Sequence, residues 1–470
     1  MVGESRGRYL IKNTFIFTVG SIATKLITFI LVPIYTHVLT TQEYGVVDLI
    51  STISMVLAPV LILNISESVM RFSLDKNADY NHIMSSGLII LLMAIFGGMI
   101  IIPVSRLFTS ISEYSHYLYF YTISCAASQL FLCFLRGKEQ LLQYTCGNII
   151  NTFSVAVLNI LFLIVFRKGI KGYLLAYIVA NVITAIYAFY VGNVVDVIKK
   201  FKINKKLTGE MLKYSLVLVP NVFMWWIMNS ADRIVITAII GTAANGIFAI
   251  AYKIPSLMST VAGIFNQAWS YSAIREEDSE DKESYTNSVY KGFFMIISLS
   301  ALGMLMILKP FIHVYVNEAY YCAWRYAPYL IIGFVFQTLG SFLSTPYTVN
   351  KDSKGFLFSA TFGAMINIIL NLLLVFKFGL TGVAIATSAS YLAVFLYRVK
   401  DTKKYIKINV FDKRYITILV LLLIQSSLVY MENIVSNILL VVLFILAVWV
   451  QRDTWCPLCS QFINKIKRKK

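Results

Sequence analysis

Charged residues are scarce in this 470-residue chain, and their scarcity is the first constraint on its class. Only 14% of the residues are Asp, Glu, Lys or Arg, whereas a soluble domain has about 25%. The four histidines, His37, His82, His116 and His313, lack metal-ligand spacing. No phosphate-cradling glycine loop, nucleophile triad or pair of catalytic carboxylates occurs. These absences exclude an ordinary cytosolic enzyme, and we expect no enzymatic activity, no metal and no cofactor.

Cysteine is also too rare to form a disulfide framework, since the chain has six. Cys125, Cys133 and Cys146 fall in apolar blocks, where we interpret them as small core residues. Cys456 and Cys459 form a Cys-Pro-Leu-Cys sequence in the tail. Its role, whether zinc binding, redox chemistry or neither, stays open.

Apolar residues are abundant instead: 58% of the chain is hydrophobic and its mean hydropathy is +0.73. They come in blocks of about 20 residues, the length of a helix that crosses a bilayer. The blocks predict an all-α polytopic membrane protein with about 14 transmembrane helices. They lie near residues 13–36, 46–66, 83–105, 116–135, 144–166, 173–195, 214–237, 246–272, 290–308, 328–349, 356–376, 380–398, 415–431 and 434–450.

The basic residues between the blocks predict the orientation. With the N-terminus in the cytoplasm, 31 of the 41 Lys and Arg residues fall in cytoplasmic segments and 7 in outer loops. Such a bias predicts a multi-pass protein of the cytoplasmic membrane with both termini inside. It also accounts for the net charge of +18, so we expect no nucleic-acid partner.

Two segments of the chain repeat each other. Residues 166–172 align with 376–382 at an offset of 210, and Gly45 aligns with Gly246 at an offset of 201. The repeat predicts two six-helix bundles related by a pseudo-twofold axis along the membrane normal. We expect bundles at 1–198 and 214–399, a basic linker at 199–213, two further helices within 400–450, and a basic cytoplasmic tail at 451–470.

Short sequences at equivalent places in the two halves carry a family resemblance. The first half has Lys12-Asn13-Thr14, Val32-Pro33 and Leu39-Thr40-Thr41-Gln42-Glu43-Tyr44-Gly45, and the second has Val219-Pro220, Ser230-Ala231-Asp232-Arg233 and the run from Gly246 to Lys253. Together they resemble the Wzx-type oligosaccharide flippases of the multidrug/oligosaccharidyl-lipid/polysaccharide (MOP) exporter superfamily. The resemblance covers about residues 10–400.

The resemblance implies a fold like that of the multidrug (MATE) exporters of the same superfamily. It implies a flippase that moves a polyprenyl-diphosphate-linked oligosaccharide from the inner to the outer leaflet for O-antigen, capsule or exopolysaccharide synthesis. Membrane lipids, a polysaccharide polymerase and chain-length proteins are the implied partners. Because no ATP-binding motif occurs, we expect energy from a proton or sodium gradient, or from the substrate's own gradient.

Ionisable residues inside apolar blocks are the candidate substrate-binding groups, because a charge in the bilayer needs a partner or a polar cavity. Lys25 lies near the middle of the first block, and Asp232, Arg233 and Lys253 lie in the seventh and eighth. Asp232 and Lys253 are about equally far from the intervening turn, so an ion pair between them is as plausible as a binding role. Lys25 and Lys253 are candidates for binding the diphosphate.

Three further charges and four prolines are candidates for gating. Asp48 lies near one end of the second block, and Glu67 and Arg71 have the i,i+4 spacing of a salt bridge at the cavity mouth. Proline interrupts the hydrogen bonds of a helix and lets it kink. The helices that lead each half contain Pro33, Pro59, Pro220 and Pro255.

Two other classes of function stay open. A drug or cation antiporter of the same fold needs carboxylates in its cavity, whereas the central charge here is Lys25. A membrane glycan polymerase or transferase needs a large outer loop, whereas the longest one here, 309–327, contains one carboxylate, Glu318.

The predicted orientation is testable by cysteine labelling from outside the cell. Reagent should reach cysteines placed at positions 170 and 320, and should not reach positions 205, 405 or 465. Labelling of position 405 from outside would reverse the predicted topology.

Overall fold

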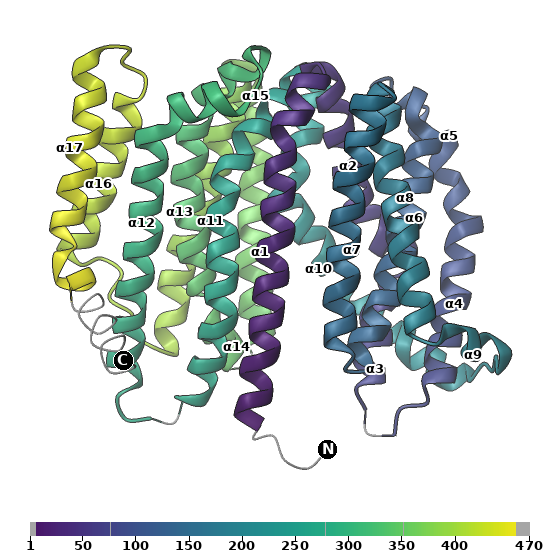
Figure 1. The fold of residues 1–470 in the computed structure, drawn as a ribbon. Helices are drawn as coiled ribbons and strands as arrows, with labels where there is room; N and C mark the ends of the chain where they lie inside the picture. The colour runs from purple at the N-terminus through teal and green to yellow at the C-terminus, as the bar shows by residue number, and fades with distance from the viewer. Residues whose placement is uncertain (1–5, 76, 278, 351, 457–470) are drawn as a thin grey trace, which may run out of the picture. The chain divides into compact units, whose positions relative to one another are not determined.

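The computed structural model describes residues 6–75, 77–277, 279–350 and 352–456, and every regular element in these ranges is helical (Figure 1). The all-α membrane fold predicted from the apolar blocks is thereby confirmed. The helices of the N-terminal part are α1 (Arg6–Val38), α2 (Thr41–Leu61), α3 (Ile65–Ser73), α4 (Tyr80–Gly97), α5 (Ile101–Ser105), α6 (Ser115–Gly137), α7 (Leu141–Asn159), α8 (Gly169–Val191), α9 (Val194–Lys199) and α10 (Lys205–Ile239).

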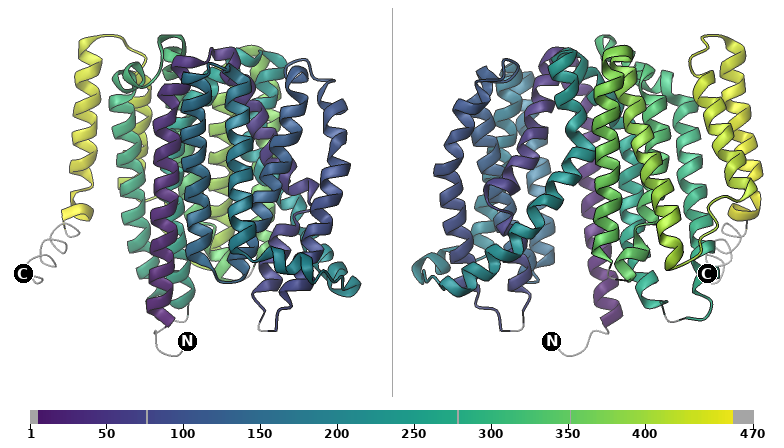
Figure 2. Two further views of the ribbon diagram at one scale, coloured as in Figure 1. Left: turned by 45° about the vertical axis from the view of Figure 1, so that its right-hand side comes forward. Right: turned by 180° about the vertical axis from the view of Figure 1, so that it is seen from behind.

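The helices continue through the C-terminal part (Figure 2). They are α11 (Thr242–Arg275), α12 (Lys282–Tyr315), α13 (Ala327–Phe342), α14 (Thr345–Val349), α15 (Ser353–Asp401), α16 (Lys413–Leu428) and α17 (Ile434–Val450). Short 3₁₀ segments lie at Gly98–Ile100, Ser112–Tyr114, Glu318–Arg325 and Thr402–Lys404, and a π-helical segment, Ile160–Val165, extends α7.

The chain forms two compact units, residues 1–246 and 247–470. In the described residues, nine helical segments are long and apolar enough to cross a membrane. The predicted count of fourteen spans stays a prediction. So do the two six-helix bundles: the boundary between the compact units follows the start of α11, whereas we expected a boundary in the basic segment 199–213. α10 packs on α2 and α3 of the first unit.

The repeated turn is present in both units. Gly169, the first residue of α8, has φ of +52°, and Gly379, inside α15, has φ of +55°. Gly379 interrupts the helical conformation of α15, which separates the two helices predicted at 356–376 and 380–398. Left-handed backbone is accessible to glycine at little cost. The offset of 210 therefore aligns two glycines that both have a positive φ, which supports the duplication.

The other aligned pair of glycines lies in one contact. A Cβ atom on Gly45 of α2 would lie 1.8 Å from the backbone oxygen of Thr242, and a Cβ on Gly246 would lie 2.0 Å from the backbone oxygen of Thr41. Gly45 thus faces Thr242, four residues before Gly246, and Gly246 faces Thr41, four residues before Gly45. The first turns of α2 and α11 touch backbone to backbone, and only glycine fits at these two positions.

Two of the proposed labelling positions are unsuitable. Ile170 and Tyr320 are buried, so a reagent would fail to reach cysteines there for reasons unrelated to topology. The neighbouring exposed residues Lys168 and Glu318 are the appropriate outer positions for the same experiment.

We predict that Gly45→Ala and Gly246→Ala each destabilise the protein. The added methyl group would overlap a backbone oxygen, and relieving such overpacking costs about 1–3 kcal/mol or more because the backbone has to move. The melting temperature of the purified protein in detergent should fall. Gly209→Ala in α10, where a Cβ would meet no atom within 4 Å, should leave it unchanged or raise it. Equal melting temperatures for all three variants would show that the glycine contact is not tight.

Candidate functional site

A polar stripe on α2 meets α10 inside the first unit. Gly45, Asp48 and Thr52 follow one another at the three- and four-residue spacing that places side chains on one helix face. Trp226 and Arg233 are seven residues apart, two turns of α10. The indole N–H of Trp226 donates to the backbone oxygen of Thr52 at 2.9 Å. The two helices are therefore joined by polar contacts at more than one level.

The ion pair of this stripe joins Asp48 and Arg233. The Nε of Arg233 donates to a carboxylate oxygen of Asp48 at 3.3 Å, and the side chains are only 9% and 17% exposed. A buried charge is tolerated when it is paired, because the partner replaces the hydration that burial removes. Asp48, which we had expected at the cavity mouth, is thus part of a buried contact between two helices.

Asn245, in the first turn of α11, completes the stripe. Its side-chain amide is fully buried and donates to the backbone oxygen of Gly45 at 2.8 Å and to Asp48 at 3.5 Å. Asp232, next to Arg233, is also buried. One carboxylate, one guanidinium and one amide, those of Asp48, Arg233 and Asn245, therefore meet among the helices. This group contains two of the predicted residues, Asp48 and Arg233, and one that sequence reasoning missed, Asn245.

An apolar cavity of about 610 Å³ lies beside this stripe. Leu49 and Ile234, the neighbours of the paired Asp48 and Arg233, belong to its walls. The remaining walls come from α2, α10, one residue of α6 and the segment from the end of α4 to residue 111; they include Ile53, Leu57, Val104, Phe108, Leu118 and Ala238. A cavity with such walls suits a hydrocarbon chain rather than a sugar.

A group of tyrosines from four helices lies near Asp48 and was not predicted. Tyr173 and Tyr177 stack at 4.9 Å between ring centroids, and Tyr35 meets the edge of Tyr173 at 5.0 Å. Tyr121 and Tyr44 extend the group at 5.6 and 6.3 Å. Their hydroxyl groups add hydrogen-bonding capacity to an otherwise apolar core.

The predicted lysines lie in different surroundings. Lys25 is exposed on α1, and none of the ion pairs within the described residues involves it. Lys253, on α11, is half-buried. The predicted pairing of Asp232 with Lys253, and the roles of both lysines in binding, stay predictions.

The salt bridge predicted between Glu67 and Arg71 is wrong. Arg71 pairs with Asp75 at 2.7 Å, and both side chains are more than half exposed. α3 ends at Ser73, so Asp75 lies in the following turn, where its carboxylate reaches Arg71 from the solvent side. Glu67 is half-buried on the side of α3 near Cys133 of α6. Glu67 and Arg71 therefore do not act as one pair.

The four candidate prolines all lie inside helices, Pro33 in α1, Pro59 in α2, Pro220 in α10 and Pro255 in α11. Only Pro59 lies just before a break: α2 ends at Leu61, and after Ile62 the residues Leu63 and Asn64 are left-handed, with φ of +49° and +53°. The bending predicted at the other three stays a prediction. The second cysteine of the tail pair, Cys459, lies outside the described residues.

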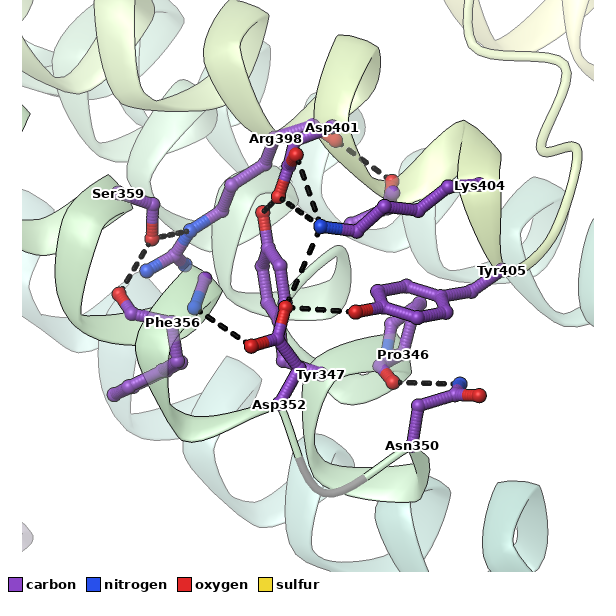
Figure 3. A network of polar contacts seen from close by, with 12 residues as sticks. Pro346, Tyr347, Asn350, Asp352, Phe356, Ser359, Arg398, Asp401, Lys404 and Tyr405 are labelled. Atoms are coloured by element: carbon purple, nitrogen blue, oxygen red, sulfur yellow. Dashed lines mark hydrogen bonds and ion pairs between the residues drawn. The ribbon is translucent and has the colours of Figure 1, made fainter.

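A second polar cluster, in the unit of residues 247–470, was also not predicted from the sequence (Figure 3). Lys404 contacts Asp401 at 3.1 Å and Asp352 at 3.4 Å. Tyr347 donates to Asp401, and Tyr405 donates to Asp352, both at 2.7 Å. The cluster holds the connection between α14 and α15 against the end of α15.

Hydrogen bonds in this cluster hold the pKa of the Asp352 carboxyl below its usual value. The largest cause is the backbone N–H of Gly355, followed by the hydroxyl of Tyr405. A carboxyl with a lowered pKa stabilises the fold above its unfolded-state pKa, and this contribution is lost as the pH falls through the folded-state value. The contribution of Asp352 is therefore lost in acid.

Arg398, one turn before Asp401, is buried although we had counted it among the cytoplasmic cations. It donates to Ser359 at 3.0 Å (Figure 3). It also donates to the backbone oxygen of Gly340 at 2.8 Å. No carboxylate within the described residues pairs with it. Its neutral acceptors join α13 to both arms of α15. We assign Arg398 to packing of this unit rather than to the first unit's polar stripe.

Removing one partner of the Asp48–Arg233 pair should strongly destabilise the protein. Asp48→Asn or Arg233→Gln leaves a buried charge, which costs on the order of 3–5 kcal/mol, and the double variant should recover part of that loss. A double-mutant cycle of unfolding free energies measures the recovery. Arg71→Gln, which breaks an exposed pair, is the matched control and should cost less than about 1 kcal/mol. Additive losses in the cycle would show that the two side chains are not coupled.

The sequence matches a known family over more than half its length. Residues 10–274 match the family model described as polysaccharide biosynthesis protein. The probable lipid II flippase MurJ of Thermotoga maritima is 29% identical over 178 residues. That alignment covers 34% of this chain and 37% of the length of that relative.

Two solved structures share the fold along most of the chain. A lipid II flippase MurJ in an inward closed conformation has a TM-score of 0.64 at 15% identity, covering 96% of this chain and 100% of the other. An inward-facing multidrug resistance MATE family transporter of the MOP superfamily has a TM-score of 0.65 at 16% identity, covering 86% and 96%. These relatives are flippases and transporters. The chain has the fold of the MOP superfamily, as its resemblance implied, and it belongs to the polysaccharide biosynthesis protein family.

Proposed function

We propose that this chain is a flippase that moves a polyprenyl-diphosphate-linked oligosaccharide from the inner to the outer leaflet of the cytoplasmic membrane by alternating access. The product would supply a cell-surface polysaccharide. Membership in the polysaccharide biosynthesis family carries the proposal, and the likeness of the whole fold to a lipid II flippase supports it. A proton or sodium gradient is the proposed energy source, since the sequence contains no ATP-binding motif.

Residues of this chain suit the two parts of such a substrate. The apolar cavity beside α2 and α10 is compatible with a polyprenyl chain. Lys25, exposed in the middle of α1, is the proposed contact for the diphosphate, with Lys253 as a second cation. An ammonium–phosphate contact away from bulk water is stronger than an exposed ion pair, because screening by solvent is weaker there.

The proposal is tested by deleting the gene for this protein in its host and expressing variants of the protein in the deletion strain. Deletion should leave the polyprenyl-linked oligosaccharide accumulated on the inner leaflet while its synthesis continues. Lys25→Ala should lower transport roughly ten-fold or more with normal membrane insertion, since a charged hydrogen bond contributes about 1.5–3 kcal/mol. Lys25→Arg should retain much of the activity.

Lys403→Ala, which removes an exposed lysine after α15, is the control and should transport normally. Wild-type transport by Lys25→Ala would exclude Lys25 as the phosphate contact. If deletion abolished synthesis of the lipid-linked oligosaccharide, a polymerase or transferase would replace the flippase proposal.

A drug or cation antiporter is the second candidate, because the fold likeness to the MATE transporter is as strong as that to the flippase. The half-buried carboxylate of Asp48 and the buried carboxylate of Asp232 are the groups on which such an antiporter would depend. Proton-coupled efflux of organic cations by proteoliposomes, abolished by Asp232→Asn, would favour the antiporter over the flippase.

A further inference from the structure

The connection between α8 and α10 combines two properties that single out one surface of the first unit. Residues 194–213 contain six lysines and two carboxylates, Asp196 and Glu210. Within them, residues 198–206 expose every side chain. We call residues 198–206 the basic bridge. It follows α8, a helix long and apolar enough to cross a membrane, by seven residues, so it lies near the depth of lipid head groups.

The basic bridge is held at both ends. Before it, Val194 and Val197 of α9 are buried in the hydrophobic core that α4, α6 and α8 share. After it, Asn204 caps α10 by accepting from the backbone N–H groups of Lys206 and Leu207 at 3.1 and 3.2 Å. Figure 1 shows α9 beside the start of α4. The bridge is therefore a short segment with fixed ends and not a free arm.

Its apolar side chains point outward. Ile198, Phe201 and Ile203 are 49%, 44% and 52% exposed, although the buried valines of α9 lie only a few residues away. The tendency of lysines to lie on the cytoplasmic side of a membrane explains the lysines at this end of α8. It does not explain why three large apolar side chains are exposed between those lysines. Apolar residues interleaved with lysines are typical of segments that lie in the membrane interface.

The lysines are available for an external anion. Lys199, Lys200 and Lys202 make no ion pair within the described residues. The basic segment after α15 differs: Lys404 there contacts Asp401 and Asp352, and Arg414 contacts Asp453. Two of its apolar residues, Ile408 and Val410, are buried. In the basic segment after α15, carboxylates thus neutralise more of the positive charge than in the basic bridge, and some of the apolar side chains are buried.

We propose that the basic bridge is a docking surface for anionic phospholipids of the leaflet beside it. The three lysines bind lipid phosphates, and Ile198, Phe201 and Ile203 enter the boundary between head groups and acyl chains. Clustered lysines next to a membrane-spanning helix attract anionic lipids, and the exposed apolar residues favour a membrane over an acidic protein. This inference does not depend on the flippase proposal.

The test uses the full chain in nanodiscs of 80% phosphatidylcholine and 20% phosphatidylglycerol, with Phe201→Trp as a reporter. Brominated acyl chains quench a nearby tryptophan, and the bromine is placed on one lipid at a time, at the same 20% mole fraction. The signal of the parent protein is subtracted to remove its six native tryptophans. Brominated phosphatidylglycerol should quench Trp fluorescence about three-fold more than brominated phosphatidylcholine at low salt, because weak electrostatic attraction enriches the anionic lipid.

Two comparisons separate selective docking from general contact with lipid. High salt should bring the quenching ratio near one, since it screens exposed charges. The added changes Lys199→Gln, Lys200→Gln and Lys202→Gln should do the same, whereas Lys403→Gln with Lys407→Gln, in the other basic segment, should leave the ratio unchanged.

Equal quenching by both lipids in the low-salt reporter protein would overturn the proposal, and so would quenching by neither lipid. The second result would favour an acidic protein as the partner. If Phe201→Trp did not fold, Ile203→Trp, at a more exposed position, provides the same measurement.

Discussion

The contact between Gly45 and Gly246 sets the geometry on which the polar stripe depends. Because neither residue has a side chain, the first turns of α2 and α11 approach until backbone meets backbone. At this separation Asn245 reaches the backbone oxygen of Gly45. The same approach fixes the height of α2 beside the end of α10, so that Asp48 lies opposite Arg233. A larger residue at either glycine would shift every level of the stripe.

Charged side chains are stabilised differently in the middle of helices and at helix ends. Asp48 and Arg233 lie in a medium with little water, where each needs a specific partner. The cluster of Asp352, Asp401 and Lys404 lies at the end of α15, where water shares the hydration. A charged side chain at a helix end keeps most of its hydration, so a lysine there needs no carboxylate partner and is available to bind an external anion. The basic bridge, with its outward apolar residues, is the clearest instance.

Sequence patterns predicted those features that are local or repeated. The turn glycines Gly169 and Gly379 were found because the duplication displays the same seven-residue pattern twice, and both have the left-handed backbone that glycine accepts. The Arg71 pair was misassigned because a spacing of four residues exists in both directions, to Glu67 and to Asp75. The end of α3 decides between them, and sequence places helix ends poorly.

Contacts between distant segments were not predictable from one sequence. Asp48 and Arg233 are 185 residues apart, and an apolar block does not reveal which neighbour each of its faces meets. The tyrosine group near Asp48 was hidden for the same reason, because its members come from four helices. Arg398 was counted as a loop cation because α15 extends farther than its apolar stretch.

The separation of Asp48 from Arg233 also has a consequence for how the protein is made. Asp48 enters the membrane with α2, and its partner is synthesised 185 residues later. At 5–20 residues per second this interval is about 10–40 s. During that time Asp48 of a nascent α2 needs contact with water, with another polar group or with the insertion machinery. The ion pair that joins α2 to α10 (Lys205–Ile239) therefore forms only after α10 has emerged from the ribosome, so the first unit cannot be completed until about half of the 470 residues have been synthesised.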